Sequence, residues 1–194
     1  MSGTSSIWPN EAQCAVTITV NLDAEFFWLS MFPDSITRPK TLSMGQYGPN
    51  RGLERVLDVF DRFGVKATFF IPGRVAEVYP EQVKEIVARG HEIGHHGYAH
   101  ENFGHLSAEE QHEALVKGLE TLGKVAGVRP VGFRAPEGEM TKDTLKLVRE
   151  LGFEYSSSMF GDDRPEFVTI EGEENRYGGN PASLGTERFP LFCV

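Results

Sequence analysis

The chain has 194 residues, of which 40% are hydrophobic and 24% charged, a composition typical of one ordinary globular domain. Its 19 basic and 28 acidic residues give a net charge of −9, which argues against nonspecific nucleic-acid binding because that needs a cationic surface. Neither a membrane-spanning apolar run nor an N-terminal secretory signal is recognisable, so we expect a cytoplasmic protein without membrane partners.

Strand-like and helix-like patterns alternate along most of the chain. Strands are expected where short runs of β-branched and aromatic residues occur, and helices where apolar residues recur at a spacing of three and four. In chain order, the sequence predicts a strand at residues 14–22, a helix at 51–63, a strand at 66–71, a helix at 81–89, a strand at 91–94, a helix from 107, a strand at 131–134, a helix at 141–151 and a strand at 153–157.

Local signals support several of these boundaries. Gly64 and Gly90 follow two of the helical patterns, as glycines that end helices do. Ser107 and Glu110 have the spacing of a capping box. The polar and weakly periodic residues 162–186 predict a long loop, and residues 188–194 resume a strand-like pattern.

The alternation of strands and helices favours an α/β fold with a parallel sheet or barrel. In such folds the functional residues usually lie at the C-terminal ends of the strands. Asp23, Pro72, His96 and Arg134 all lie at or just beyond such ends. We therefore expect these four segments to converge on one site.

The segment from Gly94 to Glu101 concentrates histidines between two glycines. His96 and His100 are four residues apart, so one helical turn would place both rings on the same side. With a carboxylate such as Asp23, two neutral imidazoles would bind a divalent metal and leave room for a water. The alternative is a solvated loop that is merely rich in histidine.

These residues resemble the polysaccharide deacetylase superfamily, also called the NodB-homology or carbohydrate esterase family 4 group. The resemblance covers roughly residues 14–158 and rests on Asp23, on the His96 and His100 pair, and on Arg134-Ala135-Pro136. It is greatest to the branch of Helicobacter-type peptidoglycan deacetylases, cyclic imide hydrolases and allantoinase-like proteins. It implies a distorted (β/α) barrel in which Asp23, His96 and His100 bind Zn²⁺ or another divalent transition metal.

The chain departs from the family pattern in three places. Leu22 stands where the family has an aspartate that acts as base, and Gly97 stands where serine or threonine often follows the first histidine. The family also supplies a late histidine, whereas this sequence has none after His112. We therefore expect residues 1–194 to be a single catalytic domain that lacks the C-terminal part of the family barrel.

Since Leu22 is unable to serve as a base, Glu25 and Glu139 are the candidate carboxylates. Arg134 would orient such a carboxylate through a bidentate salt bridge. Each of the three also has a structural interpretation, as a solvated carboxylate or as an ion-pair partner.

Three functions remain open at this point. The first is metal-dependent hydrolysis of a non-peptide carbon–nitrogen bond that removes acetyl from an N-acetylated sugar. The second is hydrolysis of a small cyclic amide, such as an imide or allantoin, and the third is a non-catalytic barrel fragment. The resemblance further implies a homo-oligomer.

Overall fold

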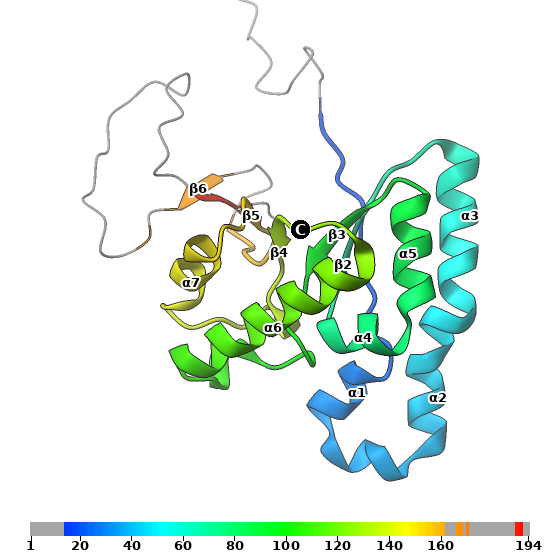
Figure 1. The fold of residues 1–194 in the computed structure, drawn as a ribbon, viewed down its shortest axis with the longest axis horizontal. Helices are drawn as coiled ribbons and strands as arrows, with labels where there is room; N and C mark the ends of the chain where they lie inside the picture. The colour runs from blue at the N-terminus through cyan, green and yellow to red at the C-terminus, as the bar shows by residue number, and fades with distance from the viewer. Residues whose placement is uncertain (1–13, 162–165, 169, 171–188, 192–194) are drawn as a thin grey trace, which may run out of the picture.

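The computed structural model describes residues 14–161, 166–168, 170 and 189–191. Strands and helices alternate along the chain, with short 3₁₀ or π segments between them (Figure 1). The elements are β1 (Thr19–Asn21), α1 (Phe26–Met31), η2 (Pro33–Thr37), α2 (Pro39–Tyr47), η3 (Gly48–Gly52), α3 (Leu53–Phe63), β2 (Thr68–Ile71), α4 (Gly73–Val78), α5 (Pro80–Ala88), β3 (Glu92–His95), η4 (Phe103–His105), α6 (Ala108–Ala126), β4 (Gly132–Phe133), η5 (Pro136–Gly138), α7 (Thr144–Glu150), β5 (Tyr155–Ser156), β6 (Glu166–Val168) and β7 (Phe189–Leu191).

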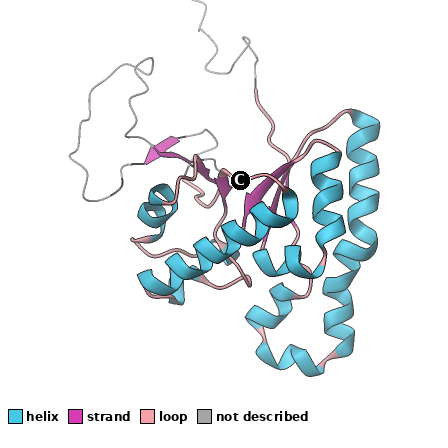
Figure 2. Cartoon of the chain, in the orientation of Figure 1, coloured by secondary structure: helices cyan, strands magenta, loops and turns pink. Residues whose placement is uncertain are grey.

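The described strands form one sheet in the order β1-β2-β3-β4-β5-β7-β6. Pairing is parallel from β1 through β7, and β6 is antiparallel to β7. The helices lie outside the strands, as Figure 2 shows. This arrangement confirms the predicted α/β class and has the architecture of a distorted (β/α) barrel. Because the strands are parallel, their C-terminal ends share one edge of the sheet.

Alternate residues of each strand face opposite sides of the sheet. Phe69 and Ile71 of β2 are fully buried in a core that includes Leu57 of α3 and Ile86 of α5. A second core lies beneath α6 and α7, and its buried members include Leu115, Phe133, Val148 and Phe153. Burial of these two cores fixes the strands that carry the site.

The opposite face carries polar groups near the N-terminal ends of the strands. Glu92 accepts hydrogen bonds from the Thr68 hydroxyl and, at 2.9 Å, from the Tyr155 hydroxyl. The Tyr155 ring occupies the space beside Gly132, where an added Cβ would lie 2.3 Å from the ring. This cluster links β2, β3, β4 and β5 at the end of the sheet remote from Asp23.

The helix predicted at residues 51–63 begins earlier than the sequence indicated. α2, the π segment η3 and α3 follow one another without a break from Pro39 to Phe63. Glycines normally argue against a helix, but Gly45 is required here by packing, since a Cβ would lie 2.6 Å from the Ala24 carbonyl oxygen and the Glu25 Cα. The close approach of α1 and α2 therefore overrides local helix propensity.

Three further differences separate the fold from the sequence-based expectation. No helix was expected at α1, and none was expected at α4, which begins directly after Pro72. The predicted long loop at residues 162–186 contains β6, because pairing with β7 satisfies its backbone groups whatever its local polarity. The remainder of that predicted loop lies outside the described residues.

The other elements are confirmed, although several strands are shorter than expected. Ser107 and Glu110 form the predicted capping box at the start of α6, and Gly64 ends α3 with a φ of 65°. The strand expected at residues 188–194 is β7 in its described part. Across the described segments, no helix has the length and apolar character needed to cross a bilayer.

Candidate metal centre

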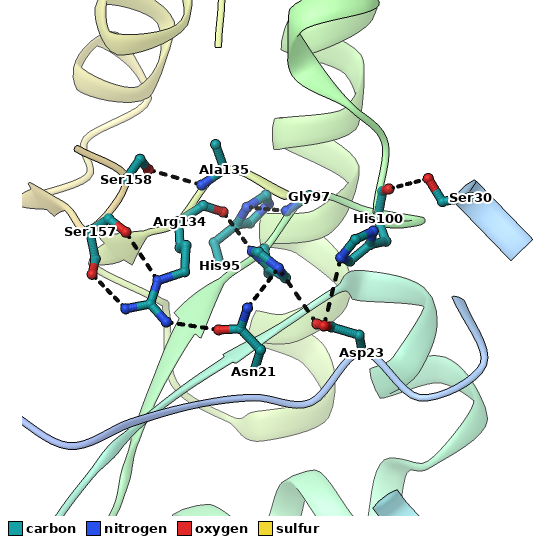
Figure 3. Close-up of polar contacts among 11 residues, drawn as sticks. Asn21, Asp23, Ser30, His95, Gly97, His100, Arg134, Ala135, Ser157 and Ser158 are labelled. Carbon is teal, nitrogen blue, oxygen red and sulfur yellow. Dashed lines mark hydrogen bonds and ion pairs between the residues drawn. The ribbon is translucent and has the colours of Figure 1, made fainter. Parts of the chain in front are cut away.

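Three side chains from different segments meet at the C-terminal edge of the sheet (Figure 3). Asp23 lies two residues beyond β1, His96 directly follows β3, and His100 comes from the loop after β3. Asp23 Oδ1 lies 3.5 Å from His96 Nε2, and Asp23 Oδ2 lies 3.7 Å from His100 Nε2. One ligand atom from each residue falls within 4.8 Å of the others, so the predicted triad is assembled.

The two histidines do not share a helical turn, and the sequence-based explanation for their proximity was wrong. The chain from His96 to His100 is a loop in which Gly97 has a φ of 71° and His100 a φ of 64°. These left-handed residues reverse the chain and bring the two ring centroids to 5.1 Å. The Gly97 position also excludes a side chain, because a Cβ would lie 2.9 Å from Glu101 Oε2 and would be strained at this φ.

Neighbouring elements hold this loop in place. The Ser30 hydroxyl of α1 donates to the His100 carbonyl at 2.6 Å. At the start of α4, the Gly73 amide donates to the Gly97 carbonyl and the Arg74 amide to the Tyr98 carbonyl, at 3.2 and 2.7 Å. The positions of the two histidines are therefore fixed by α1 and α4, which are two of the helices that sequence patterns did not predict.

The hydrogen bonds of His96 determine which of its nitrogens is free. Nδ1 lies 2.8 Å from the Arg134 carbonyl oxygen, which only accepts, so Nδ1 carries the proton. Nε2 then has a lone pair directed toward Asp23. In metal sites the imidazole nitrogen that does not bind the metal usually donates a hydrogen bond of this kind, which fixes the tautomer.

The three residues fit a divalent transition metal. Ligand atoms around a tetrahedral ion with bonds of about 2.0–2.1 Å lie roughly 3.4 Å apart. The two imidazole nitrogens lie 3.5 and 3.7 Å from one or the other oxygen of Asp23, close to that spacing. Asp23 Oδ1 is buried and has no hydrogen-bond partner among the described residues. A buried acceptor without a partner is costly, and a cation bound at this point would satisfy it.

In the absence of a metal, burial disfavours the charged form of each of the three side chains. Burial raises the pKa of Asp23 to about 7, against the nearby Arg134 charge that lowers it. Burial also lowers the pKa of His96 to about 3, and His100 adds to that effect, while burial is the main cause that lowers the pKa of His100. Both imidazoles are therefore neutral at pH 7, which is the protonation state that binds metals.

A cavity of 230 Å³ is lined by two residues that contact His96, Asn21 and Arg134, although no triad residue lines it. Residues from three stretches of the chain line it, including Asn21, Arg134, Glu137, Ser157, Ser158 and Phe160. Asn21 connects the cavity to the triad, because its Nδ2 lies 3.4 Å from His96 Nε2. A substrate in this cavity would therefore lie beside the proposed ligands.

Arg134 is buried in the wall of this cavity and stacks on Phe70, with its guanidinium carbon 4.1 Å from the ring centroid. It donates to Asn21 Oδ1 at 2.8 Å, and to the carbonyl and hydroxyl oxygens of Ser157 at 3.0 and 2.7 Å. Within the described segments these acceptors are all neutral, so the carboxylate partner predicted for Arg134 is replaced by the Asn21 amide.

The two carboxylates proposed as bases lie elsewhere. Glu25 Oε2 accepts a hydrogen bond from the Tyr79 hydroxyl at 2.8 Å, which directs it toward α4 and α5. The Glu139 side chain packs beside Gly104, whose added Cβ would lie 3.3 Å from the Glu139 Cβ. Neither residue lines the cavity.

Sequence reasoning missed Asn21, Glu137 and Ser157. A signal for Asn21 was present, because it is the last residue of β1 and lies at the same strand end as Asp23. Glu137 lies between Pro136 and Gly138 just beyond β4, two residues from the glutamate that was selected instead. No local pattern marks Ser157, since its contact with Arg134 joins residues 23 positions apart.

The buried histidines predict how the metal-free protein responds to acid. The pKa values of His95 and His96 are lowered by burial to about 3, so from pH 6.5 downward the unfolded chain binds protons that the folded chain does not. Asp23 acts oppositely between pH 3.8 and about 7, because its folded form is the one that binds the proton. Burial lowers the pKa of His100 as well, so the histidines outnumber Asp23 and the free energy of unfolding is expected to fall as the pH is lowered from 6.5 to 4. Urea unfolding in the presence of chelator at pH 7, 6, 5 and 4 measures this change in stability. A urea midpoint that stays level or rises as the pH falls would contradict the prediction.

Comparison with known proteins identifies the family. The family described as polysaccharide deacetylase matches residues 44–156, more than half of the chain. A peptidoglycan deacetylase from Helicobacter pylori is 34% identical over 156 residues, which are 80% of this chain and 53% of that protein. The chain thus spans about half the length of the curated relatives it matches.

Solved structures agree. A protein from Mycobacterium smegmatis assigned as a polysaccharide deacetylase superposes with a TM-score of 0.86 at 37% identity, over 98% of this chain and 62% of that one. An allantoinase structure has a TM-score of 0.72 at 22% identity, over 96% of this chain and 63% of that one, and shares the fold. The matching family, the fold and the assembled triad together show that this chain belongs to the polysaccharide deacetylase family.

Proposed function

We propose that this chain is a metal-dependent amide hydrolase that removes acetyl from an N-acetylated sugar. The observation that carries the proposal is the assembled triad of Asp23, His96 and His100, whose neighbours Asn21 and Arg134 line a 230 Å³ cavity. Membership of a deacetylase family supports the acetamide as the bond that is broken.

The three residues would hold a divalent transition metal, with zinc as the first candidate. When bound, such an ion polarises an amide carbonyl and makes water a nucleophile near neutral pH. His96 would contribute Nε2, since its Nδ1 proton faces the Arg134 carbonyl. Asp23 would bind as a carboxylate, so metal binding releases its proton at a pH below about 7.

The remaining groups would position the substrate. Arg134 fixes the Asn21 amide through Oδ1, which turns Nδ2 of Asn21 toward His96 and the mouth of the cavity. The Arg134 guanidinium would add positive charge beside the substrate carbonyl oxygen that becomes an oxyanion. Within the described segments, it donates its hydrogen bonds to neutral oxygens. Phe160, 77% exposed, lines the same cavity and provides an apolar surface for a sugar ring.

Metal content and acetate release test the proposal together. The purified protein is stripped with chelator, reloaded with zinc, cobalt or manganese, and supplied with N-acetylglucosamine oligomers. We expect close to one ion per chain and acetate release that requires it. A protein that binds no metal after loading would contradict the mechanism.

The substrate panel should also contain a cyclic imide and allantoin. Turnover of these compounds with no acetate release would replace the sugar with a cyclic amide as substrate. Metal binding with no turnover of any compound would support the non-catalytic alternative.

A further inference from the structure

Leu22 before Asp23 leaves the candidate site without an obvious proton acceptor, and the cavity contains a carboxylate that could fill this role. Glu137 lines the cavity together with Asn21 and Arg134. Asn21 and Arg134 themselves contact His96, through Nδ2 at 3.4 Å and the carbonyl oxygen at 2.8 Å. Glu137 therefore faces the same space that a substrate would occupy beside the triad.

The backbone at Glu137 is unusual. Its φ of 60° and ψ of 4° are left-handed, a conformation that is strained for a residue with a side chain. Among the described residues only three non-glycine residues have positive φ, namely Ala24, His100 and Glu137. Ala24 follows one member of the triad and His100 is another. Backbone strain of this kind gathers at functional sites, so the pattern associates Glu137 with the triad.

The side chain of Glu137 is held by a residue close to the triad in the chain. The Asn102 amide donates to Glu137 Oε2 at 2.7 Å, and Asn102 lies two residues beyond His100. A glycine at this position would adopt the same backbone without strain, so the side chain has to be explained by something other than the turn.

The other acidic residues near the site do not line the cavity. Glu25 accepts from Tyr79, and Glu101 accepts from the Tyr98 amide at 2.9 Å. Glu139 packs beside Gly104 and does not line the cavity. Asn21, which holds the Arg134 guanidinium, is a neutral amide that accepts no proton.

We propose that Glu137 is the general base of this site, an assignment that rests on the proposed function. Its carboxylate takes one proton from the attacking water as the new carbon–oxygen bond forms at the acetamide carbonyl. It returns that proton to the nitrogen as the carbon–nitrogen bond breaks. The products are acetic acid and the free amine, so atoms and protons balance without any other reactant.

Two substitutions of Glu137 separate a chemical role from a structural one. Glu137→Gln keeps the shape and removes the base, so we expect kcat to fall by about 10²–10⁴-fold while KM and the metal bound per chain stay unchanged. Glu137→Gly removes the base and the strain, so the metal-free protein should melt about 2 °C higher although activity is lost. A residue present only to shape the turn would give the opposite result, with glycine active. Glu154→Gln, at an exposed glutamate before β5, is the matched control and should behave as wild type.

The outcomes distinguish the assignment of Glu137 as general base from the proposed function on which it rests. An active wild type with an equally active Glu137→Gln variant overturns the assignment and leaves the proposed function intact. Loss of activity only in parallel with loss of metal also overturns it, as does a fall in kcat for Glu139→Gln in place of Glu137→Gln. A metal-loaded wild type that hydrolyses no amide overturns both proposals together.

Discussion

Replacing His96 with alanine is expected to weaken metal binding by more than about 100-fold and to abolish amide hydrolysis. Residues that merely support a metal ligand typically change affinity or activity by about 10–100-fold, so loss of a ligand atom should exceed that range. His96 is 1% exposed and its Nε2 faces Asp23, which makes it the most enclosed member of the triad. Calorimetric zinc titration of stripped protein, alongside acetate release, measures both effects.

The control for this experiment is another histidine. His105 in η4 is exposed and remote from the triad's ligand atoms, so His105→Ala should bind metal and turn over substrate as wild type does. Circular dichroism of His96→Ala establishes whether the variant keeps its fold. A folded His96→Ala protein with an undiminished zinc affinity would show that the metal, if bound, is held elsewhere.

Replacing Gly118 with alanine is expected to destabilise the protein by about 3 kcal/mol, at the upper end for a group inserted into a packed core. The new Cβ would lie 2.2 Å from His95 Nε2 and 2.9 Å from the Gly97 carbonyl oxygen. His95 is unable to move freely, because Nε2 bonds to the Leu115 carbonyl at 3.1 Å and Nδ1 accepts from the Gly97 amide at 3.2 Å. The displacement should therefore reach the loop that carries His96 and lower metal affinity as well.

The same helix provides the control. Gly123 also lies in α6, but no atom lies within 4 Å of a Cβ added there. Gly123→Ala should therefore stabilise the protein by about 0.5–1 kcal/mol through helix propensity alone. Urea unfolding of the two variants measures the difference. A Gly118→Ala variant that is as stable as Gly123→Ala would contradict the steric explanation.

Most of the elements could be read from the sequence because their signals are local. The capping box of Ser107 and Glu110, and the glycine that ends α3, depend on residues within one or two turns. By contrast, α1 and α2 were missed because their packing is not local. Gly45 of α2 is required by a close contact with the residues after β1, some twenty positions away. The strand β6 was missed for a related reason, as its partner β7 lies farther along the chain.

The candidate site divides in the same way. Asp23, His96 and His100 were selected by residue type and by their position after strands. The structure brings these three side chains together. The reason given for the proximity of the two histidines failed, because a loop with two left-handed residues replaces the expected helical turn. The carboxylate that faces the cavity was also misjudged, since nothing in the order of residues 136–139 tells which side chain the turn directs inward.

The sequence by itself determined the α/β class, the order of most strands and helices, and the residue types of the candidate metal-binding set. These follow from periodicity and from the chemistry of individual side chains, both of which are local properties. The tertiary structure decided the contacts that join distant segments, such as Asn21 with His96, 75 positions apart, and Arg134 with Asn21, 113 positions apart. Such contacts depend on how parallel strands bring their ends to one edge, and that arrangement exists only once the chain has packed.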